Sequence, residues 1–285
     1  GEQGTYAWKN DETDGTGFVH NNGTVHFDFE TGGGTGDTKA KELTWGHVKW
    51  TGDEASHELT FEPSTGTSVT IAKDLTIHEG YCRPTTLTHS LIVTEDVLIE
   101  SGGKIGHVNH TGAMTFGSLT ISSGGEYIAT SGTTTLTSTS SNYSINNAGT
   151  FTHNNGTVKI DFETPNYNAN SKIKLNQMYN LEIEMNRTTD MTLLEPESST
   201  TLTALNNVTV KKGVLTKNSH THTLDFKGLT VVGVGGGSLA AHIDASTSGS
   251  ATSNFGSLTI LTDGKYTQST TTNVSSIRNV GGTIA

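Results

Sequence analysis

The stretch FVHNNGTVHFDFET, from Phe18 to Thr31, occurs a second time as FTHNNGTVKIDFET, from Phe151 to Thr164. Each position of the second copy carries a number 133 higher than its counterpart in the first, and most of the positions are identical. The same offset relates Leu75-Thr-Ile77 to Val208-Thr-Val210 and Gly80 to Gly213. A match of this length at a constant offset indicates an internal repeat rather than coincidence.

Further along, FGSLTI at Phe116 returns at Phe255 with an offset of 139, so we place an insertion of six residues in the Gly/Ser-rich stretch from Gly233 to Asn254. We divide the chain into the end of a preceding repeat (1–14), a first repeat (15–147), a second repeat (148–281) and the start of a following repeat (282–285). This division predicts a window on a longer repeat array. Two independently folded domains of one family are the alternative.

Short runs in which apolar residues alternate with Thr or Ser fill both repeats, as in SVTI from Ser68 and SLTI from Ser118. Alternation with a period of two is the pattern of a half-buried β-strand. Asn-Gly, Gly-Gly and Asp-Gly pairs separate the runs, and such pairs favour turns. No segment keeps an apolar period of 3.6 over a dozen residues, so we predict an all-β protein with many short strands.

A parallel β-helix, or β-solenoid, fits these strands better than the alternative of tandem β-sandwich domains. The apolar runs are three or four residues long, which is shorter than a usual sandwich strand. Aromatic residues make up only 7% of the chain, as expected for a narrow interior filled by aliphatic side chains. At about 20–25 residues per coil, we expect a rod of roughly a dozen coils.

The composition excludes several classes of protein. The 28 acidic and 17 basic residues give a net charge of −11 at pH 7, which disfavours binding to nucleic acid. No run approaches the roughly 18 apolar residues of a membrane-spanning helix, so we predict no membrane insertion. The single cysteine, Cys82, excludes a disulfide scaffold.

Three segments carry a resemblance to a known family: Gly149 to Asp161, Tyr179 to Ile183 and Leu202 to Thr216. They resemble the parallel β-helical repeats of large bacterial surface adhesins and of fibre proteins of marine tailed phages. The resemblance covers most of residues 15–230, although Leu43-Thr-Trp45 stands where the second repeat has Leu181-Glu-Ile183. It implies an extended element on a cell or virion surface and no catalytic residues.

Two carboxylate pairs recur at the same register, Asp28 with Glu30 and Asp161 with Glu163. Residues two apart share a strand face and lie about 6.6–6.8 Å apart, a range that could suit the two carboxylates of a glycosidase. Because both repeats carry the pair, it behaves as part of the repeat, and a solvated strand face explains it equally well.

Trp45 and Trp50 are candidates for stacking on a sugar ring. They are five residues apart, so a regular strand would place them on opposite faces and expose at most one of them. These tryptophans are therefore a hint of glycan contact.

No pattern predicts a metal or a cofactor. His220 and His222 alternate on one expected strand, but the first repeat has Leu87 and His89 there. Asn10 to Gly15 resembles the start of a calcium loop, yet its twelfth position is Asn21 rather than glutamate, so we interpret it as an acidic turn. We also expect Cys82 to be inert.

The sequence thus predicts a non-catalytic structural segment of an extracellular or virion-surface fibre or adhesin. The alternative is a tailspike-like module that binds or degrades polysaccharide. Open end coils expose unpaired strand edges, so we expect self-association into a homotrimer or a filament, with a surface glycan as the other candidate partner.

Overall fold

The structure is a computed structural model of the chain. It describes the residues 6–9, 18–29, 38–42, 44–137, 143–162, 170–185, 187–197, 201–217, 219, 221–236, 240–246, 252–268 and 271–285.

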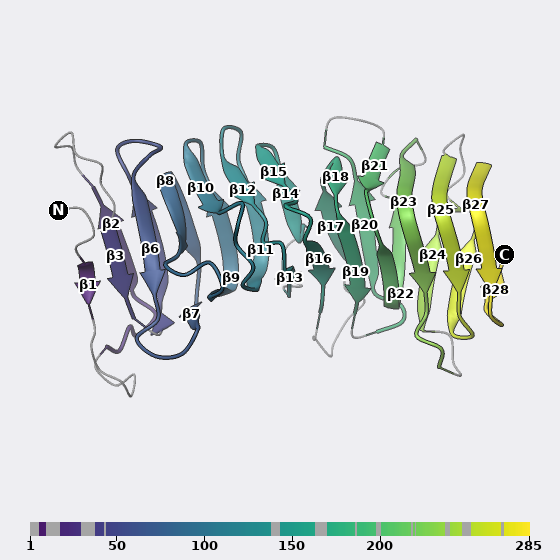
Figure 1. The fold of residues 1–285 in the computed structure, drawn as a ribbon, viewed down its shortest axis with the longest axis horizontal. Coiled ribbons are helices and arrows are strands. Elements are labelled where there is room, and N and C mark those ends of the chain that lie inside the picture. The colour runs from purple at the N-terminus through teal and green to yellow at the C-terminus, as the bar shows by residue number, and fades with distance from the viewer. Residues whose placement is uncertain are drawn as a thin grey trace. The chain divides into compact units, whose positions relative to one another are not determined.

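The fold is an all-β parallel β-solenoid of about nine turns, and its described residues form strands and no helix (Figure 1). The fold class predicted from the sequence is therefore confirmed, but the number of turns is lower than the expected dozen. Some turns are longer than the expected coil, as the pairing of Val48 with Leu75 and of Phe226 with Phe255 shows.

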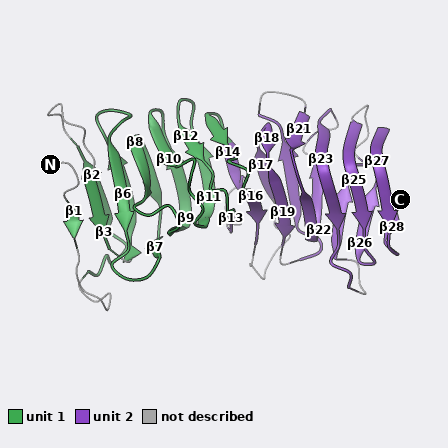
Figure 2. Cartoon of the chain, viewed as in Figure 1, with its two compact units in different colours: residues 1–134, 147–156 green, residues 135–146, 157–285 purple. Residues whose placement is uncertain are grey.

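The chain separates into two compact units (Figure 2). Unit 1 comprises residues 1–134 and 147–156, and unit 2 comprises residues 135–146 and 157–285. In each unit the turns contribute strands to three faces, and the paired strands on each face run parallel.

The first face of unit 1 consists of β2 (Thr24–Asp28), β5 (His47–Thr51), the first half of β8 (Leu75–Pro84) and the second halves of β9 (Ser90–Ile99) and β11 (Met114–Ile121). The second face consists of β1 (Tyr6–Lys9), β3 (Thr38–Lys41), β6 (Glu58–Glu62), the second half of β8, β10 (Gly103–Gly106), β12 (Glu126–Ile128) and β15 (Thr150–Thr152). The third face consists of β4 (Thr44–Trp45), β7 (Ser68–Ile71) and the first halves of β9 and β11.

Unit 2 repeats this three-faced arrangement. Its first face consists of β16 (Thr157–Ile160), β19 (Asn180–Glu184), the first half of β22 (Val208–Lys217) and the second halves of β23 (Thr223–Val232), β25 (Thr252–Ile260) and β27 (Thr271–Asn279). The second face consists of β17 (Asn170–Lys174), β20 (Met191–Glu195), the second half of β22, β24 (Ala241–Asp244), β26 (Gly264–Thr267) and β28 (Thr283–Ile284). The third face consists of β18 (Gln177–Met178), β21 (Thr201–Ala204) and the first halves of β23, β25 and β27. Two further strands, β13 (Thr133–Leu136) and β14 (Ile145–Asn147), lie where the residue ranges of the units alternate.

Columns of inward side chains form the core of each unit. On the first face of unit 1, Val48, Leu75, Val97 and Leu119 occupy the same register in successive turns, and each is 2% exposed or less. The residues on either side of them are mostly half-buried, as the alternating pattern predicts, but Asp96 is exposed and Ser118 is buried. Stacking equivalent apolar side chains removes each from water on two sides, so each turn stabilises the next.

One equivalence inferred from the sequence is wrong. Local similarity matches Leu43-Thr-Trp45 to Leu181-Glu-Ile183. In the structure, however, Val48 pairs with Val25 as Leu181 pairs with Val158. Trp45 instead pairs with Ile71 on the third face. The constant offset between the repeats gives the correct partner here, because strand register follows turn length rather than local similarity.

Candidate functional site

The two predicted carboxylate pairs are only half described by the structure. Asp28 lies exposed at the end of β2, with its Oδ2 4.0 Å from Nε2 of His26. Asp161 follows β16 and makes an ion pair with Lys159 at 2.7 Å. Glu30 and Glu163 lie outside the described residues, so the structure gives no separation for either pair.

Trp45 and Trp50 are both fully buried, so neither indole offers a ring face to a sugar. A regular strand would have placed them on opposite sides, but the chain bends at Gly46 between β4 and β5. A Cβ at Gly46 would lie 2.4 Å from the Gly23 carbonyl oxygen, so only glycine fits this bend. The bend turns both indoles inward, where Trp45 packs against Phe27 and Trp50 against Phe29.

A ladder of alternating charges covers the first face of unit 2. Nζ of Lys159 lies 2.7 Å from Asp161 and 2.9 Å from Glu184. Nζ of Lys211, two turns further on, lies 2.8 Å from Glu182 and 3.2 Å from Glu184. Hydrogen bonding to Lys159 holds the pKa of Glu184 below its ordinary value, and a hydrogen bond to Glu182 raises the pKa of Lys211. Every carboxylate of the ladder has a cationic partner, so this arrangement stabilises the face and offers no general acid.

Histidine turns recur in both repeats. Nδ1 of His20 accepts a hydrogen bond from the Asn22 amide, and Nδ1 of His153 accepts one from the Asn155 amide, each at 3.0 Å. Asn22 and Asn155 adopt a φ of 58°, which asparagine tolerates better than most residues. Burial lowers the pKa of His153, in keeping with a ring nitrogen that accepts this bond. The two histidines therefore stabilise these turns.

Among the described residues, no three His, Cys, Asp or Glu side chains are grouped to hold a metal. His220 and the residues from Asn10 to Gly15 lie outside the described part of the chain. Cys82 is fully buried, and burial raises the pKa of its thiol. In the part of the chain that the structure describes, no helix could span a membrane.

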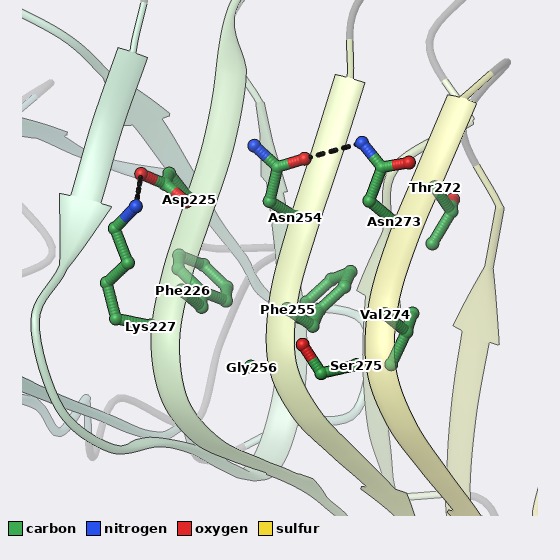
Figure 3. Close-up of a pocket in the computed structure, with 10 residues that line it drawn as sticks. All are labelled: Asp225, Phe226, Lys227, Asn254, Phe255, Gly256, Thr272, Asn273, Val274 and Ser275. Carbon is green, nitrogen blue, oxygen red and sulfur yellow. Dashed lines mark hydrogen bonds and ion pairs between the residues drawn. The ribbon is translucent and has the colours of Figure 1, made fainter.

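A hollow with a volume of about 680 Å³ lies over β23, β25 and β27 of unit 2 (Figure 3). Asp225, Asn254 and Asn273 occupy one register in three successive turns and form a row along it. The Asn273 Nδ2 donates to the Asn254 Oδ1 at 2.9 Å, and Asp225 makes an ion pair with Lys227 at 2.7 Å. Phe226 and Phe255 are buried in the core, where their rings pack edge to face with centroids 5.6 Å apart.

Inspection of the sequence missed this row because its members are widely and unequally separated along the chain. Comparison of equivalent positions in the two repeats does reveal the row. The register of unit 1 places Ile92 beside Thr115 where unit 2 has Asp225 beside Asn254. A polar row that one repeat has and the other lacks is a candidate for function, since the repeat itself does not require it.

The fold and these surfaces define a parallel β-solenoid with a charged outer face and a polar hollow in unit 2. No family model matches the chain, and neither a curated protein nor a solved structure matches it significantly.

Proposed function

We propose that the chain is a structural segment of an extended fibre or adhesin on the surface of a cell or virion, without catalysis of its own. The observation that carries this proposal is the internal repeat, whose inward positions are buried alike in both units. Val48 and Leu181 are each 2% exposed, and Trp50 and Ile183 are fully buried. Repetition of a packed turn lengthens a structure without building a new site, which suits a spacer that presents a surface.

Cryo-electron microscopy of the native particle or cell surface would test this role. We expect appendages with strand layers spaced by about 4.8 Å, into which the coordinates of each unit fit. Antibodies against the chain should label the same appendages. Labelling confined to the cell interior, with no such appendage, would contradict the proposal.

Polysaccharide cleavage is the rival function. It requires Asp28 or Asp161 to act as an acid or nucleophile. Asp161 instead forms an ion pair with Lys159. Replacing Asp161 and Glu163 with alanine should leave any activity on host polysaccharide unchanged. A loss of cleavage in that variant, with the fold intact by circular dichroism, would support the enzyme instead.

We further propose that copies of the chain associate with each other. Apolar side chains are exposed on and beside the last two strands of unit 2: Ile277 is 53% exposed, and Val280 and Ile284 are each 39% exposed. Light scattering should show a mass that rises with concentration, and Ile277→Asp should reduce this association. A monodisperse wild-type monomer at high concentration would contradict it.

A further inference from the structure

The lining of the hollow over β23, β25 and β27 includes Gly256, where no side chain fits. Lys227 and Gly228 together face the single residue Gly256, which makes a bulge between the two halves of β23. A Cβ at Gly256 would lie 1.9 Å from the Lys227 carbonyl oxygen. The strand therefore carries glycine here, and the space between Lys227 and Ser275 stays open (Figure 3).

Unit 1 has the same bulge without the same polar row. Thr94 and Glu95 face Gly117, and a Cβ at Gly117 would lie 2.3 Å from the Glu95 carbonyl oxygen. The backbone geometry thus belongs to the repeat. The row of Asp225, Asn254 and Asn273 belongs to unit 2 alone, because the corresponding pair in unit 1 is Ile92 and Thr115.

The row presents both kinds of hydrogen-bonding group to the hollow. The bond from Asn273 to Asn254 uses one N–H of Asn273 and the carbonyl oxygen of Asn254. The amide nitrogen of Asn254 remains as a donor and the side-chain oxygen of Asn273 as an acceptor. Ser275, exposed at the edge of the hollow, adds a hydroxyl that can do both.

The charge of the hollow favours a neutral ligand. Its one carboxylate, Asp225, is paired with its one ammonium, Lys227, at 2.7 Å. The net charge of −11 over the whole chain disfavours an anion, and the lysine in the hollow disfavours a cation. A ligand rich in hydroxyl groups matches a surface of alternating donors and acceptors, because each hydroxyl both donates and accepts.

We propose that the hollow over β23, β25 and β27 binds a neutral oligosaccharide through Asn254, Asn273, Asp225 and Ser275. Its volume of about 680 Å³ lies within the range of small-ligand sites, and it accommodates a few sugar rings. Phe226 and Phe255 are 1% and 3% exposed, so recognition depends on hydrogen bonds rather than on ring stacking. This binding goes beyond the structural role and does not depend on it.

Titration calorimetry of the full chain would test the site with maltotetraose, cellotetraose, xylotetraose and chitotetraose, each up to about 10 mM. We expect at least one of them to bind. Asn254→Ala combined with Asn273→Ala should weaken that binding by about tenfold or more, since two hydrogen-bonding side chains are lost. Thr115→Ala, at the equivalent position of unit 1, is the matched control and should leave it unchanged.

A second variant distinguishes loss of the binding site from loss of the fold. Ser275→Leu fills the open edge of the hollow without touching the bond between Asn254 and Asn273, and it should also weaken binding by about tenfold. Binding that is unaffected by both variants, or no binding by any of the four tetrasaccharides, would overturn the proposal. Neither result bears on the surface-fibre role, which rests on microscopy of the native appendage.

Discussion

The first faces of the two units have equivalent interiors and different exteriors. Inside, Trp50 of unit 1 and Ile183 of unit 2 occupy the same repeat position, and both are fully buried. Outside, His26 donates to or accepts from the Thr51 hydroxyl at 2.9 Å, whereas its counterpart Lys159 takes part in the charged ladder. Inward positions must fill a closed column, so they remain apolar, while outward positions contact water and are free to differ. Sites particular to this protein should therefore lie on the outer faces.

We expect the largest change in stability from truncating a buried, inward-facing side chain. Trp50→Ala should lower the free energy of unfolding by about 3–5 kcal/mol, because the cavity left by an indole cannot close. Ile183→Val, at the same position of unit 2, should cost only about 0.5–1.5 kcal/mol. Urea denaturation followed by circular dichroism would measure both. A loss for Trp50→Ala no larger than that for Ile183→Val would show that the indole is not tightly packed.

Fluorescence sharpens this measurement, because all three tryptophans, Trp8, Trp45 and Trp50, belong to unit 1. Fluorescence thus reports unfolding of unit 1, whereas circular dichroism reports both units.

The next largest effect is an increase in the free energy of unfolding. Lys217 is 3% exposed, and its Nζ has no hydrogen-bond partner among the described residues. It shares a register position with the buried Leu194 of the preceding turn. Lys217→Met should stabilise unit 2 by about 1–3 kcal/mol at pH 7, by removing an unsatisfied buried amine. Lys212→Met, on the same strand, is the control and should change little.

The pH dependence of Lys217→Met provides a separate check. Burial lowers the pKa of Lys217 in the folded chain, although Asp244 opposes this. The folded state then binds this proton less tightly than the unfolded state, so wild-type stability should rise with pH until the unfolded lysine loses its proton near 10.5. The advantage of Lys217→Met should shrink over that window, and a constant advantage would contradict the assignment.

Acid should lower the stability of both units, because each contains histidines whose pKa is lowered in the folded state. Burial lowers the pKa of His110 and of His153 in unit 1, and of His242 in unit 2. His110 is fully buried and bonds to the His89 carbonyl oxygen at 2.9 Å, with His107 and Arg83 further disfavouring its charged form. Since the unfolded histidines take up protons first, stability should fall as the pH drops below 6.5.

His110→Gln tests this dependence in unit 1. Glutamine keeps a donor for the His89 carbonyl but does not titrate, so the fluorescence-detected loss of stability between pH 7 and pH 5 should be smaller than in the wild type. An unchanged slope would mean that His110 does not contribute.

The smallest effect should come from the outer ladder. Lys159→Met removes the partner of Asp161 and Glu184, whose side chains are 26% and 42% exposed. Partly exposed pairs contribute little, so we expect a loss of at most about 1 kcal/mol. The loss should shrink further in 1 M salt, where charges are screened within about 3 Å. A larger loss that salt does not alter would show that packing of the lysine chain matters more than its charge.

Much of the fold was predictable because a repeat with a period-two pattern constrains it strongly. Thr-flanked apolar runs such as that from Ser68 to Ile71 fixed both the strands and their inward faces. The count of turns was less accurate, since inserted residues lengthen individual turns without altering the pattern. Trp45 shows a second source of error, because a bend at one glycine reverses which side of the strand is buried.

The sequence by itself determined the repeat, the all-β class, the inward columns and the lack of a disulfide framework. These properties follow from local alternation and from composition, which need no knowledge of neighbours in space. Only the tertiary structure decided that Asp225, Asn254 and Asn273 form one row, and that Lys217 is buried without a partner among the described residues. The turn that brings Asn273 beside Asn254 is much shorter than the turn before it, which brings Asn254 beside Asp225. Contacts between turns therefore depend on strand register and have no fixed spacing along the chain.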